Sequence, residues 1–405
     1  MRHFNLNDFI STYVTERKES FFAQDLKDNH AELAARIDGK SVLVIGGAGT
    51  IGSSYIRALL HFKPARLYVV DINENGLTEL TRDIRSTVGL NVPEDYKPYP
   101  INFGDAVFAK IFRNEGPFDI VANFAAHKHV RSEKDHYSIE AMVDNNVLKA
   151  KVLLELLMEQ PPEHFFCVST DKAANPVNVM GASKKLMEEV IMAYSTKLKI
   201  STARFANVAF SNGSLLFGFI ERMMKQQPLS SPKDVKRYFV SPEESGQLCL
   251  LACMLGESGD IFFPKLREEQ MKTFSAIAED FLRVYGGYAA DKCANETEAK
   301  EKARNLPADS NSYPVLFFDS NTSGEKTFEE FFTKTEEVDQ DRFAQLGVVK
   351  NTRRQSLKEI DGMFTRLRDL FTQPELDKAA IIRLINDFIP NFEHIETGRS
   401  LDQKM

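Results

Sequence analysis

The sequence predicts an α/β fold built on a Rossmann-like, doubly wound parallel sheet. Two observations carry this prediction. An apolar run leads through a glycine-rich turn into a helix, and further apolar runs alternate with segments of helical periodicity. Strands that alternate with helices are typical of a parallel sheet covered by helices on both faces. We also expect a smaller C-terminal lobe and helical extensions at both ends.

The first predicted strand, residues 41–45, runs into a turn with three glycines in GxxGxxG spacing. Glycines leave room for backbone amides to approach a pyrophosphate, and the N-terminus of the next helix, expected at 53–62, adds a partial positive charge. The spacing departs from the GxGxxG fingerprint, but the strand and helix around it are those that a dinucleotide site requires. The candidate cofactor-binding residues of this turn are Gly46, Gly49, Thr50, Ile51 and Gly52.

The second predicted strand, residues 65–70, ends in Asp71, about 20 residues after the glycine turn. A carboxylate here accepts hydrogen bonds from a ribose 2′-hydroxyl and repels a 2′-phosphate, so we expect NAD rather than NADP as the cofactor. Asp71 could instead serve only to cap the following helix. Asn73 is a further candidate cofactor-binding residue.

Four more strands are predicted at 99–103, 118–124, 164–168 and 200–207. The first of these leads to an acidic residue in the place where this fold usually contacts adenine. The second leads to two small residues where the backbone passes close to the cofactor. Such small residues also pack well for purely structural reasons. The resulting candidates for cofactor contacts are Asp105, Ala125 and Ala126.

The most informative segment follows the predicted strand at 164–168. Residues 170–172, Thr-Asp-Lys, lie at the carboxyl end of this strand, where open α/β sheets place their ligand crevice. Apolar residues from 182 to 196 recur at helical spacing, so Met180 and Lys184 open a helix and share one face. A lysine four residues after a tyrosine on such a helix is the pairing of the short-chain dehydrogenases/reductases. Here a methionine takes the place of the tyrosine.

Four segments resemble the extended short-chain dehydrogenases/reductases of the UDP-N-acetylglucosamine 4,6-dehydratase group, which act in capsule, flagellar and bacillosamine-type polysaccharide biosynthesis. The third segment is the specific one, and some members of this branch also have methionine in place of the tyrosine. The resemblance runs from residue 39 to 332, apart from an insertion-like stretch at 291–312. The four segments are 46–52, 123–130, 169–184 and 204–208.

The resemblance implies an NAD-dependent dehydratase that converts UDP-N-acetylglucosamine or GDP-N-acetylglucosamine to the 4-keto-6-deoxy sugar nucleotide. In this reaction the sugar is oxidised at C4, water is eliminated across C5 and C6, and the hydride returns to C6. The cofactor is regenerated in each turnover and can therefore stay bound. Both the choice of nucleotide and the configuration at C5 stay open.

The resemblance also assigns roles to residues. Lys172 would be the base at C5, Asp171 the acid for loss of water, and Thr170 a hydrogen-bond partner near O4. Lys184 would orient the nicotinamide ribose and supply positive charge. Lys172 must be partly neutral to act as a base, which burial or the charge of Lys184 would favour. Because position 180 holds no phenol, deprotonation of the C4 hydroxyl falls to Asp171 or to a water bound to Thr170.

Candidate substrate-binding residues lie in several of the similar segments. Residues 236–241 resemble the family's arginine-containing segment, and residues 324–326 resemble its proline-glycine-glutamate-lysine turn. Thr322 and Ser323 stand where many relatives have arginine and proline before that glycine. The candidates are Lys128, His129, Asn207, Ser214, Arg237 and Glu325.

Two other functions stay open. A 4- or 5-epimerase would use the same cofactor and cleft, but the 4-epimerases of this superfamily rely on the tyrosine that Met180 replaces. A catalytically silent NAD-binding or sensor protein would explain Met180, but it would have no need of Asp171 and Lys172. Each of these residues alone could be an ordinary turn or surface residue. An acid, a base and a ribose-binding lysine together at the ends of cofactor-binding strands favour an enzyme.

The composition limits the partners. The chain has 405 residues, 43% of them hydrophobic, and a net charge of −7, which gives a large core and no basic surface for nucleic acid. The four cysteines lack CxxC spacing and the histidines lack suitably spaced partners, so we expect no metal site. No run approaches the ~18 apolar residues of a membrane helix and no signal peptide is present, so we expect a soluble, cytoplasmic protein. A homo-oligomer, dimeric or higher, is also expected.

We predict four regions along the chain. They are a helical extension at 1–38, an NAD-binding Rossmann domain at 39–210, a substrate-binding lobe at 211–335 and a helical extension at 336–405. The stretch at 291–312 within the lobe has the charge pattern of an exposed helix or a mobile insertion. We expect the C-terminal extension to cap the lobe or to mediate contacts between subunits.

Overall fold

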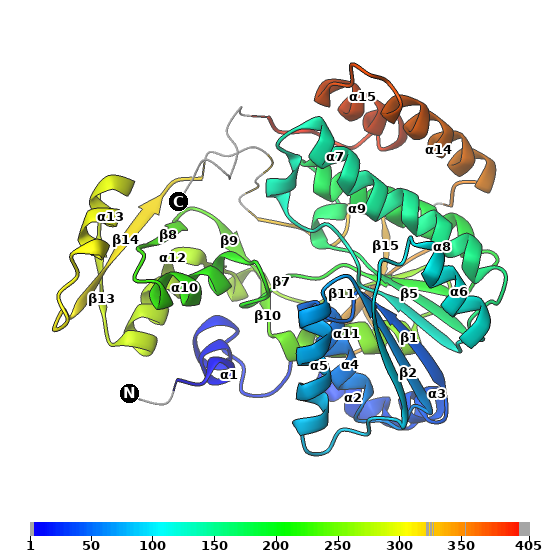
Figure 1. The fold of residues 1–405 in the computed structure, drawn as a ribbon, viewed down its shortest axis with the longest axis horizontal. Coiled ribbons are helices and arrows are strands. Elements are labelled where there is room, and N and C mark those ends of the chain that lie inside the picture. The colour runs from blue at the N-terminus through cyan, green and yellow to red at the C-terminus, as the bar shows by residue number, and fades with distance from the viewer. Residues whose placement is uncertain (1–3, 321–323, 325, 327, 353, 397–405) are drawn as a thin grey trace.

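A nine-stranded sheet forms the centre of the part of the chain that the structure describes, in the strand order β15-β16-β11-β6-β5-β4-β1-β2-β3 (Figure 1). All neighbours from β3 to β11 run parallel, whereas β16 is antiparallel to β11 and to β15. The predicted Rossmann-like, doubly wound sheet is confirmed. The computed structural model describes residues 4–320, 324, 326, 328–352 and 354–396. The strands are β1 Ser41–Ile45, β2 Arg66–Asp71, β3 Asp95–Pro100, β4 Ile120–Asn123, β5 His164–Val168, β6 Ile200–Ala203, β11 Asp260–Pro264, β15 Glu337–Asp339 and β16 Leu346–Lys350.

Helices cover both faces of this sheet (Figure 1). The chain passes from β1 through β2 to β3 at one edge and then returns to β4 on the other side of β1. Right-handed crossovers in opposite directions put the connecting helices on opposite faces and leave a crevice at the carboxyl ends of β1 and β4. α4 packs against α11, and α8 packs against α9. The helices are α4 Thr50–Leu59, α5 Glu74–Ser86, α6 Ala106–Glu115, α7 His136–Val143, α8 Lys149–Leu157, α9 Val179–Tyr194 and α11 Pro242–Leu255.

The strands lie close to their predicted ranges, with two differences. β3 runs from Asp95 to Pro100 instead of 99–103, and the strand predicted at 200–207 divides into β6 and a short β7, Asn207–Val208. β1, β4 and β5 are buried along nearly their whole length, which explains their continuous apolar sequences. Within the described ranges, no helix has both the length and the apolar character needed to cross a bilayer.

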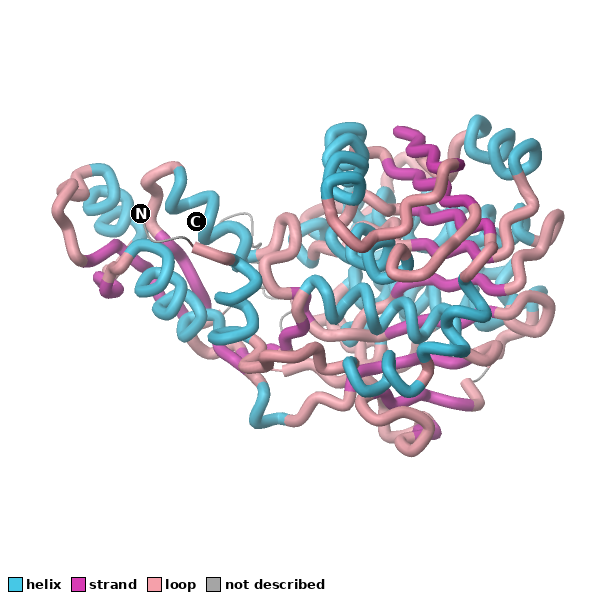
Figure 2. Tube along the Cα trace, turned by 90° about the horizontal axis from the view of Figure 1, so that it is seen from below, coloured by secondary structure: helices cyan, strands magenta, loops and turns pink. Residues whose placement is uncertain are grey.

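A smaller lobe is built around a three-stranded parallel sheet in the order β13-β14-β8. Figure 2 shows this lobe to the left of the larger domain. The stretch at 291–312 is part of the lobe and not an addition to it, because it supplies α13 and the adjoining ends of β13 and β14. Ala299 and Ala303 of α13 are buried there. The elements are β8 Leu229–Pro232, β13 Ala289–Lys292, β14 Ser312–Phe318, α10 Leu215–Met224, α12 Phe274–Phe281 and α13 Glu296–Arg304.

Two short strand pairs, β7 with β10 and β9 with β12, lie where the chain passes between the lobe and the larger domain. α11 packs on α4 and β6, and β11 belongs to the large sheet. The lobe is therefore interrupted in sequence, whereas we predicted one continuous segment at 211–335. The short strands are β9 Lys236–Arg237, β10 Phe239–Val240 and β12 Lys272–Thr273.

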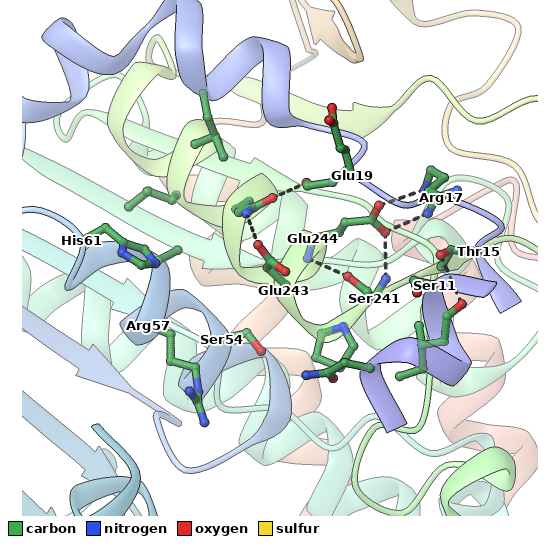
Figure 3. A pocket seen from close by; sticks show the side chains of 18 of the residues that line it. Ser11, Thr15, Arg17, Glu19, Ser54, Arg57, His61, Ser241, Glu243 and Glu244 are labelled. Atoms are coloured by element: carbon green, nitrogen blue, oxygen red, sulfur yellow. Dashed lines mark hydrogen bonds and ion pairs between the residues drawn. The ribbon is translucent and has the colours of Figure 1, made fainter. Parts of the chain in front are cut away.

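The N-terminal extension contacts both domains. Phe9 packs in the lobe core, with its ring centroid 5.8 Å from that of Phe281, whereas α2 and α3 pack against α11. Between them, Arg17 donates hydrogen bonds of 2.8 and 2.7 Å to Glu244 (Figure 3). A cavity of about 710 Å³ lies between this extension, α4 and α11, and shares no lining residue with the glycine turn. The helical segments are α1 Leu6–Phe9, η1 Ile10–Val14, α2 Ala23–Asp28 and α3 His30–Ile37.

The C-terminal extension is not wholly helical, in contrast to the prediction. β15 and β16 extend the large sheet, and Val348 and Val349 of β16 are buried against β11. α14 then packs against α9, and α15 packs against α7 and α9. Both helices cover the larger domain and not the lobe, as Figure 1 shows at the upper right. Their bounds are α14 Leu357–Phe371 and α15 Lys378–Phe388.

Candidate active site

The glycine turn between β1 and α4 has no room for a side chain at Gly46 or at Gly52. A Cβ on Gly46 would lie 2.4 Å from the backbone nitrogen of Ala125, and a Cβ on Gly52 would lie 2.3 Å from the carbonyl oxygen of Gly46. Gly46 also has a φ of +74°, which favours glycine. Gly49 is the N-cap residue of α4, and no side chain caps this helix. The N–H groups of its first turn are therefore available to an anion.

A cavity of about 210 Å³ opens at this turn, at the carboxyl ends of β1, β2 and β4. It brings together most of the candidate cofactor-binding residues, namely Gly46, Gly49, Thr50, Ile51, Gly52, Asp71, Ala125 and Ala126. Other lining residues are not indicated by the sequence pattern: Ile72, Ile101, Asn102, Phe103 and Asn145.

Asn73, Asp105 and Lys184, which are also candidate cofactor-binding residues, do not line this cavity. Asn73 caps α5, where its Oδ1 accepts a hydrogen bond of 2.9 Å from the backbone of Gly76. Asp105 is the N-cap residue of α6, and its carboxylate accepts a hydrogen bond of 3.3 Å from the backbone of Asn102. Because β3 ends at Pro100, the residues that follow it directly fill the place expected for Asp105.

Asp71 joins the second strand to the glycine turn. Its Oδ2 accepts a hydrogen bond of 2.9 Å from the backbone of Ala48, and its Oδ1 accepts one of 2.9 Å from the backbone of Asn73. The carboxylate is thus held beside the cavity with further acceptor positions available. A helix N-terminus without a side-chain cap, a turn that excludes side chains at Gly46 and Gly52, and a fixed carboxylate fit the pyrophosphate and ribose of a dinucleotide.

Thr170, Asp171 and Lys172 follow β5 and begin a short 3-10 turn, η4 Asp171–Ala173, which we call the catalytic turn. The buried Asp171 accepts three hydrogen bonds at Oδ1: 2.7 Å from Thr170 Oγ1, 2.9 Å from Lys172 N and 3.0 Å from Lys172 Nζ. The candidate acid and base are therefore in direct contact. Since β5 runs parallel to β4, this turn lies at the same sheet edge as Ala125.

α9 begins beside the catalytic turn and carries Met180 and Lys184, both buried. The Nζ of Lys184 donates a hydrogen bond of 2.6 Å to the carbonyl of Val168 and lies 3.3 Å from the sulfur of Met187. Burial lowers the pKa of Lys184. Lys184 thus points toward the end of β5, while the ammonium of Lys172 contacts Asp171.

A chain of polar groups links α9 to the segment that lines the cofactor cavity. The Oδ1 of Asn146 accepts a hydrogen bond of 2.8 Å from the backbone of His127. Its Nδ2 donates one of 3.0 Å to Ser183 Oγ, which in turn donates one of 2.7 Å to the carbonyl of Met180. Asn146 and Ser183 are buried, and no sequence spacing marks them. This chain fixes the start of α9 relative to the cavity.

The described residues of segment 324–330, which we call the docking loop, pack over the catalytic turn. The carbonyl of Gly324 accepts a hydrogen bond of 2.8 Å from Asn178 Nδ2, and Lys326 Nζ donates one of 2.5 Å to the carbonyl of Asn175. A Cβ on Gly324, whose φ is +73°, would lie 2.6 Å from the Cβ of Asn178. The docking loop is therefore closely fitted to the residues between Lys172 and α9.

Glu329 of the docking loop is buried beside Lys172, and sequence reasoning did not identify it. Its Oε1 lies 3.9 Å from Lys172 Nζ and 4.0 Å from Arg237 Nη2. Burial raises the pKa of Glu329, although the charge of Lys172 acts in the opposite direction. The buried Arg237 also donates hydrogen bonds of 2.9 and 3.0 Å to the carbonyls of Lys236 and Lys326.

Three candidate substrate-binding residues gather between the cofactor cavity and the lobe. Lys128 Nζ donates a hydrogen bond of 2.9 Å to the carbonyl of Asn212. The ring of His129 lies against Gly213, where a Cβ would come within 3.2 Å of it. Ser214 follows directly and caps α10 with its side chain. Of these three residues, Lys128 also lines the cofactor cavity.

The other candidates lie elsewhere. Asn207 is in β7, which pairs with β10. Arg237 lies near the catalytic turn, and Glu325 falls outside the described residues.

Across the described part of the chain, no three or more histidine, cysteine or acidic side chains are arranged to hold a metal ion.

The last described segment, residues 389–396, which we call the C-terminal strap, runs along the other side of the residues between Lys172 and α9. Backbone hydrogen bonds of 3.2 and 3.0 Å join Glu393 to the carbonyl of Pro176 and Ile395 to the carbonyl of Val177. The carbonyl of Ile395 also accepts one of 2.9 Å from the docking-loop glycine. The strap and the docking loop therefore both contact this segment, and they contact each other.

A buried ion network supports the start of the catalytic turn. Ser169 Oγ donates a hydrogen bond of 2.7 Å to Glu188, which also accepts two from Arg204, at 2.8 and 2.6 Å. Arg204 donates two more, both of 2.9 Å, to Glu336. Burial alone would raise the pKa of Glu188, but the adjacent Arg204 outweighs it and holds the pKa at about 2. Through Arg204, the network connects α9 to the end of β6 and to the segment before β15.

The sequence matches one family model along most of its length. The match covers residues 42–351, and the family is described as polysaccharide biosynthesis protein. This region contains the glycine turn, the catalytic turn, the lobe and the large sheet. The N-terminal helices, α14, α15 and the C-terminal strap lie outside it.

Several curated proteins are similar to parts of the chain. An uncharacterized membrane protein of Methanocaldococcus jannaschii is 35% identical over 254 residues, which are 61% of this chain and 73% of that protein. The probable polysaccharide biosynthesis protein EpsC of Bacillus subtilis is 31% identical over 235 residues, 57% of this chain and only 39% of that protein. A UDP-N-acetylglucosamine 4,6-dehydratase (inverting) of Campylobacter jejuni is 25% identical over 241 residues, 56% of this chain and 68% of that protein.

Solved structures share the fold. Pen from Bacillus thuringiensis superimposes with a TM-score of 0.60 at 20% identity, over 79% of this chain and 90% of that one. DesIV, a dTDP-glucose 4,6-dehydratase from Streptomyces venezuelae, superimposes with a TM-score of 0.54 at 18% identity, over 86% and 97%. Because the family match covers most of the chain, the chain belongs to the polysaccharide biosynthesis protein family.

Proposed function

We propose that this protein is an NAD-dependent 4,6-dehydratase of UDP-N-acetylglucosamine, with GDP-N-acetylglucosamine as the alternative substrate. The observation that carries the proposal is the contact between Asp171 and Lys172 at the carboxyl end of β5, with methionine at position 180 of the adjacent helix. Elimination of water needs a base that removes a proton from one carbon and an acid that protonates the oxygen leaving the next carbon. Lys172 and Asp171 are candidates for these two groups. The Campylobacter dehydratase among the similar proteins supports the same assignment.

The residues around the glycine turn support NAD as the cofactor. The N-terminus of α4 would hold the pyrophosphate, and the carboxylate of Asp71 would accept hydrogen bonds from the ribose and repel a 2′-phosphate. Lys184 would orient the nicotinamide ribose once it turns from Val168. A dinucleotide held there would supply the hydride acceptor for C4 of the sugar and the hydride donor for C6.

Asp171 and Lys172 would divide the proton transfers. The carbonyl formed at C4 acidifies the C5 hydrogen, and neutral Lys172 removes it as a proton. In the oxidation step Asp171 takes the proton of the C4 hydroxyl, directly or through a water bound to Thr170, and it then donates this proton to the C6 oxygen as water leaves. When the hydride reaches C6, Lys172 returns its proton to C5, so no net proton is consumed.

An epimerase is the competing function. UDP-glucose 4-epimerases of Rickettsia species are also similar to this chain, for example at 26% identity over 254 residues for Rickettsia typhi. A thioether has no proton to exchange with a hydroxyl, so Met180 cannot replace a tyrosine in that reaction. An epimerase also has no use for an acid that protonates a leaving hydroxyl, whereas a dehydratase needs one, and the buried Asp171 beside Lys172 supports that role.

The test is incubation of the purified protein with each of the two nucleotide sugars, without added cofactor, followed by mass spectrometry. We expect one of them to lose the mass of one water. A substrate deuterated at C4 sharpens the result, because transfer from C4 to C6 keeps the deuterium in the product. An unchanged mass with new sugar NMR signals would identify an epimerase. An unchanged mass and spectrum with NAD bound would identify a silent binding protein.

A further inference from the structure

Glu329 is a buried carboxylate that the proposed reaction does not use. Its side chain is 4% exposed, and its Oε1 lies 3.9 Å from Lys172 Nζ. On the catalytic turn itself, Asp171 Oδ1 lies 3.0 Å from the same nitrogen. The ammonium of Lys172 is therefore within reach of two carboxylates, one from its own turn and one from a loop far away in the sequence.

The docking loop holds Glu329 in this place. Lys326 Nζ donates a hydrogen bond of 2.5 Å to the carbonyl of Asn175, whose side-chain nitrogen donates one of 2.8 Å to Glu330. Because burial raises the pKa of Glu329, this carboxylate takes up a proton more readily than an exposed one. The charged groups that face it are Lys172 and Asp171 from the catalytic turn, Arg237 from β9 and Lys326 from its own loop.

We propose that Glu329 is a positioning residue that acts through Lys172, holding its amino group in place and exchanging one proton with it. This proposal rests on the dehydratase function. The ammonium of Lys172 passes a proton from Nζ to the carboxylate of Glu329. The neutral amine then takes the proton from C5, and the reverse transfers restore both groups. The exchange leaves the total number of protons on the pair unchanged.

The pH dependence of turnover distinguishes this role from a purely structural one. While the proton moves within the pair, the neutral fraction of Lys172 does not depend on the solvent pH in the neutral range. Asp171 must carry its own proton at this step, as the acid for loss of water, so it cannot accept the proton of Lys172. Without Glu329, Lys172 must therefore release its proton to solvent, and turnover then rises about tenfold per pH unit. Loss of a structural contact would instead lower turnover by the same factor at every pH.

The first experiment measures kcat of the full-length enzyme from about pH 6 to 9, a range centred on neutral pH, for the wild type and for Glu329→Gln. The control is Glu330→Gln, an exposed position of the same loop where glutamine still accepts the hydrogen bond from Asn175. We expect flat profiles for the wild type and the control and a rising profile for Glu329→Gln. Parallel profiles for all three would overturn the proposal. Glu329→Asp keeps a carboxylate and should retain a flat profile at reduced kcat, which tests the proposal if the glutamine variant does not fold.

A second experiment is independent of turnover. The reactivity of Lys172 toward acetic anhydride is measured against pH by peptide mass spectrometry, without substrate. In Glu329→Gln, half-maximal reactivity should move to lower pH by about one unit, because a nearby negative charge is lost, and Glu330→Gln should match the wild type. An unchanged midpoint would overturn the proposal even if water loss is observed. A shifted midpoint without water loss by the wild type would reject the dehydratase function and retain the coupling between Glu329 and Lys172.

Discussion

The Nε2 atom of His394 lies 2.9 Å from Oε1 of Glu133, and Oε2 of the same carboxylate accepts a hydrogen bond of 2.5 Å from the backbone of Val179. The side chains of His394 and Glu133 are both buried. Val179 is the first residue of α9, directly before Met180. The C-terminal strap, which lies outside the family match, is thereby connected to the start of the helix that carries Met180 and Lys184.

We predict that His394→Ala lowers kcat about tenfold and changes KM less than threefold. The substitution leaves the buried Glu133 without this partner, so the start of α9 loses part of its support, and small displacements of catalytic groups reduce rates strongly. His394→Gln keeps a hydrogen-bond donor and should restore most of kcat. His61→Ala, at an exposed position, is the control. Steady-state measurement of kcat and KM for these variants tests the prediction. An unchanged kcat for His394→Ala would show that the strap does not position the site.

Lys172→Ala should abolish product formation, by about 10³-fold or more, because no other group then removes the C5 proton. The cofactor should stay bound, since the glycine turn and Asp71 are untouched. Product mass and the absorbance of released NAD measure the two effects separately. Lys197→Ala, at an exposed position of the chain, should behave as the wild type. Full turnover by Lys172→Ala would show that the assigned base is wrong.

The central sheet could be predicted because local physics fixes it. Strands buried on both faces have continuous apolar sequences, and the glycine turn has a spacing that few other structures need. β16 was missed although Val348 and Val349 form a short β-branched run beside Gly347, because the rest of the extension has helical periodicity. Its pairing with β11 depends on a contact between distant parts of the chain, which periodicity does not report.

The candidate site could be predicted only where its residues are close in sequence. The catalytic turn and the start of α9 form one continuous motif. Glu329, Glu133 and His394 reach it from other parts of the chain, and a single glutamate or histidine carries no sequence signal. Asp105 lies outside the cofactor cavity for a local reason. The preceding strand ends early, and the carboxylate of Asp105 turns back to the backbone of Asn102.

Met180→Ala should have a milder effect on turnover than Lys172→Ala, less than about tenfold, because the thioether transfers no proton. The main effect of Met180→Ala should be a lower free energy of unfolding. Met180 is 3% exposed, and truncation of a buried methionine destabilises proteins by about 2–5 kcal/mol. Met180→Leu nearly conserves the volume and should cost less than about 1.5 kcal/mol. Denaturant unfolding and kcat of both variants test this, and a loss of turnover as large as that of Lys172→Ala would assign Met180 a direct part in the reaction.

The ion pair between Glu188 and Arg204 should make the protein sensitive to acid. Arg204 holds the pKa of Glu188 at about 2, below its ordinary value of 4.5, so the stabilisation is fully present above pH 4.5 and is lost as the pH falls toward 2. The difference corresponds to about 3 kcal/mol. Glu188→Gln should lower the free energy of unfolding at pH 7 by about 3–5 kcal/mol, because Arg204 stays buried without its partner, and should make the decline between pH 4.5 and 2 shallower. Glu155→Gln, at an exposed position, should leave both unchanged. Denaturant unfolding at several pH values measures these slopes, and equal slopes for the wild type and Glu188→Gln would show that other carboxylates cause the acid sensitivity.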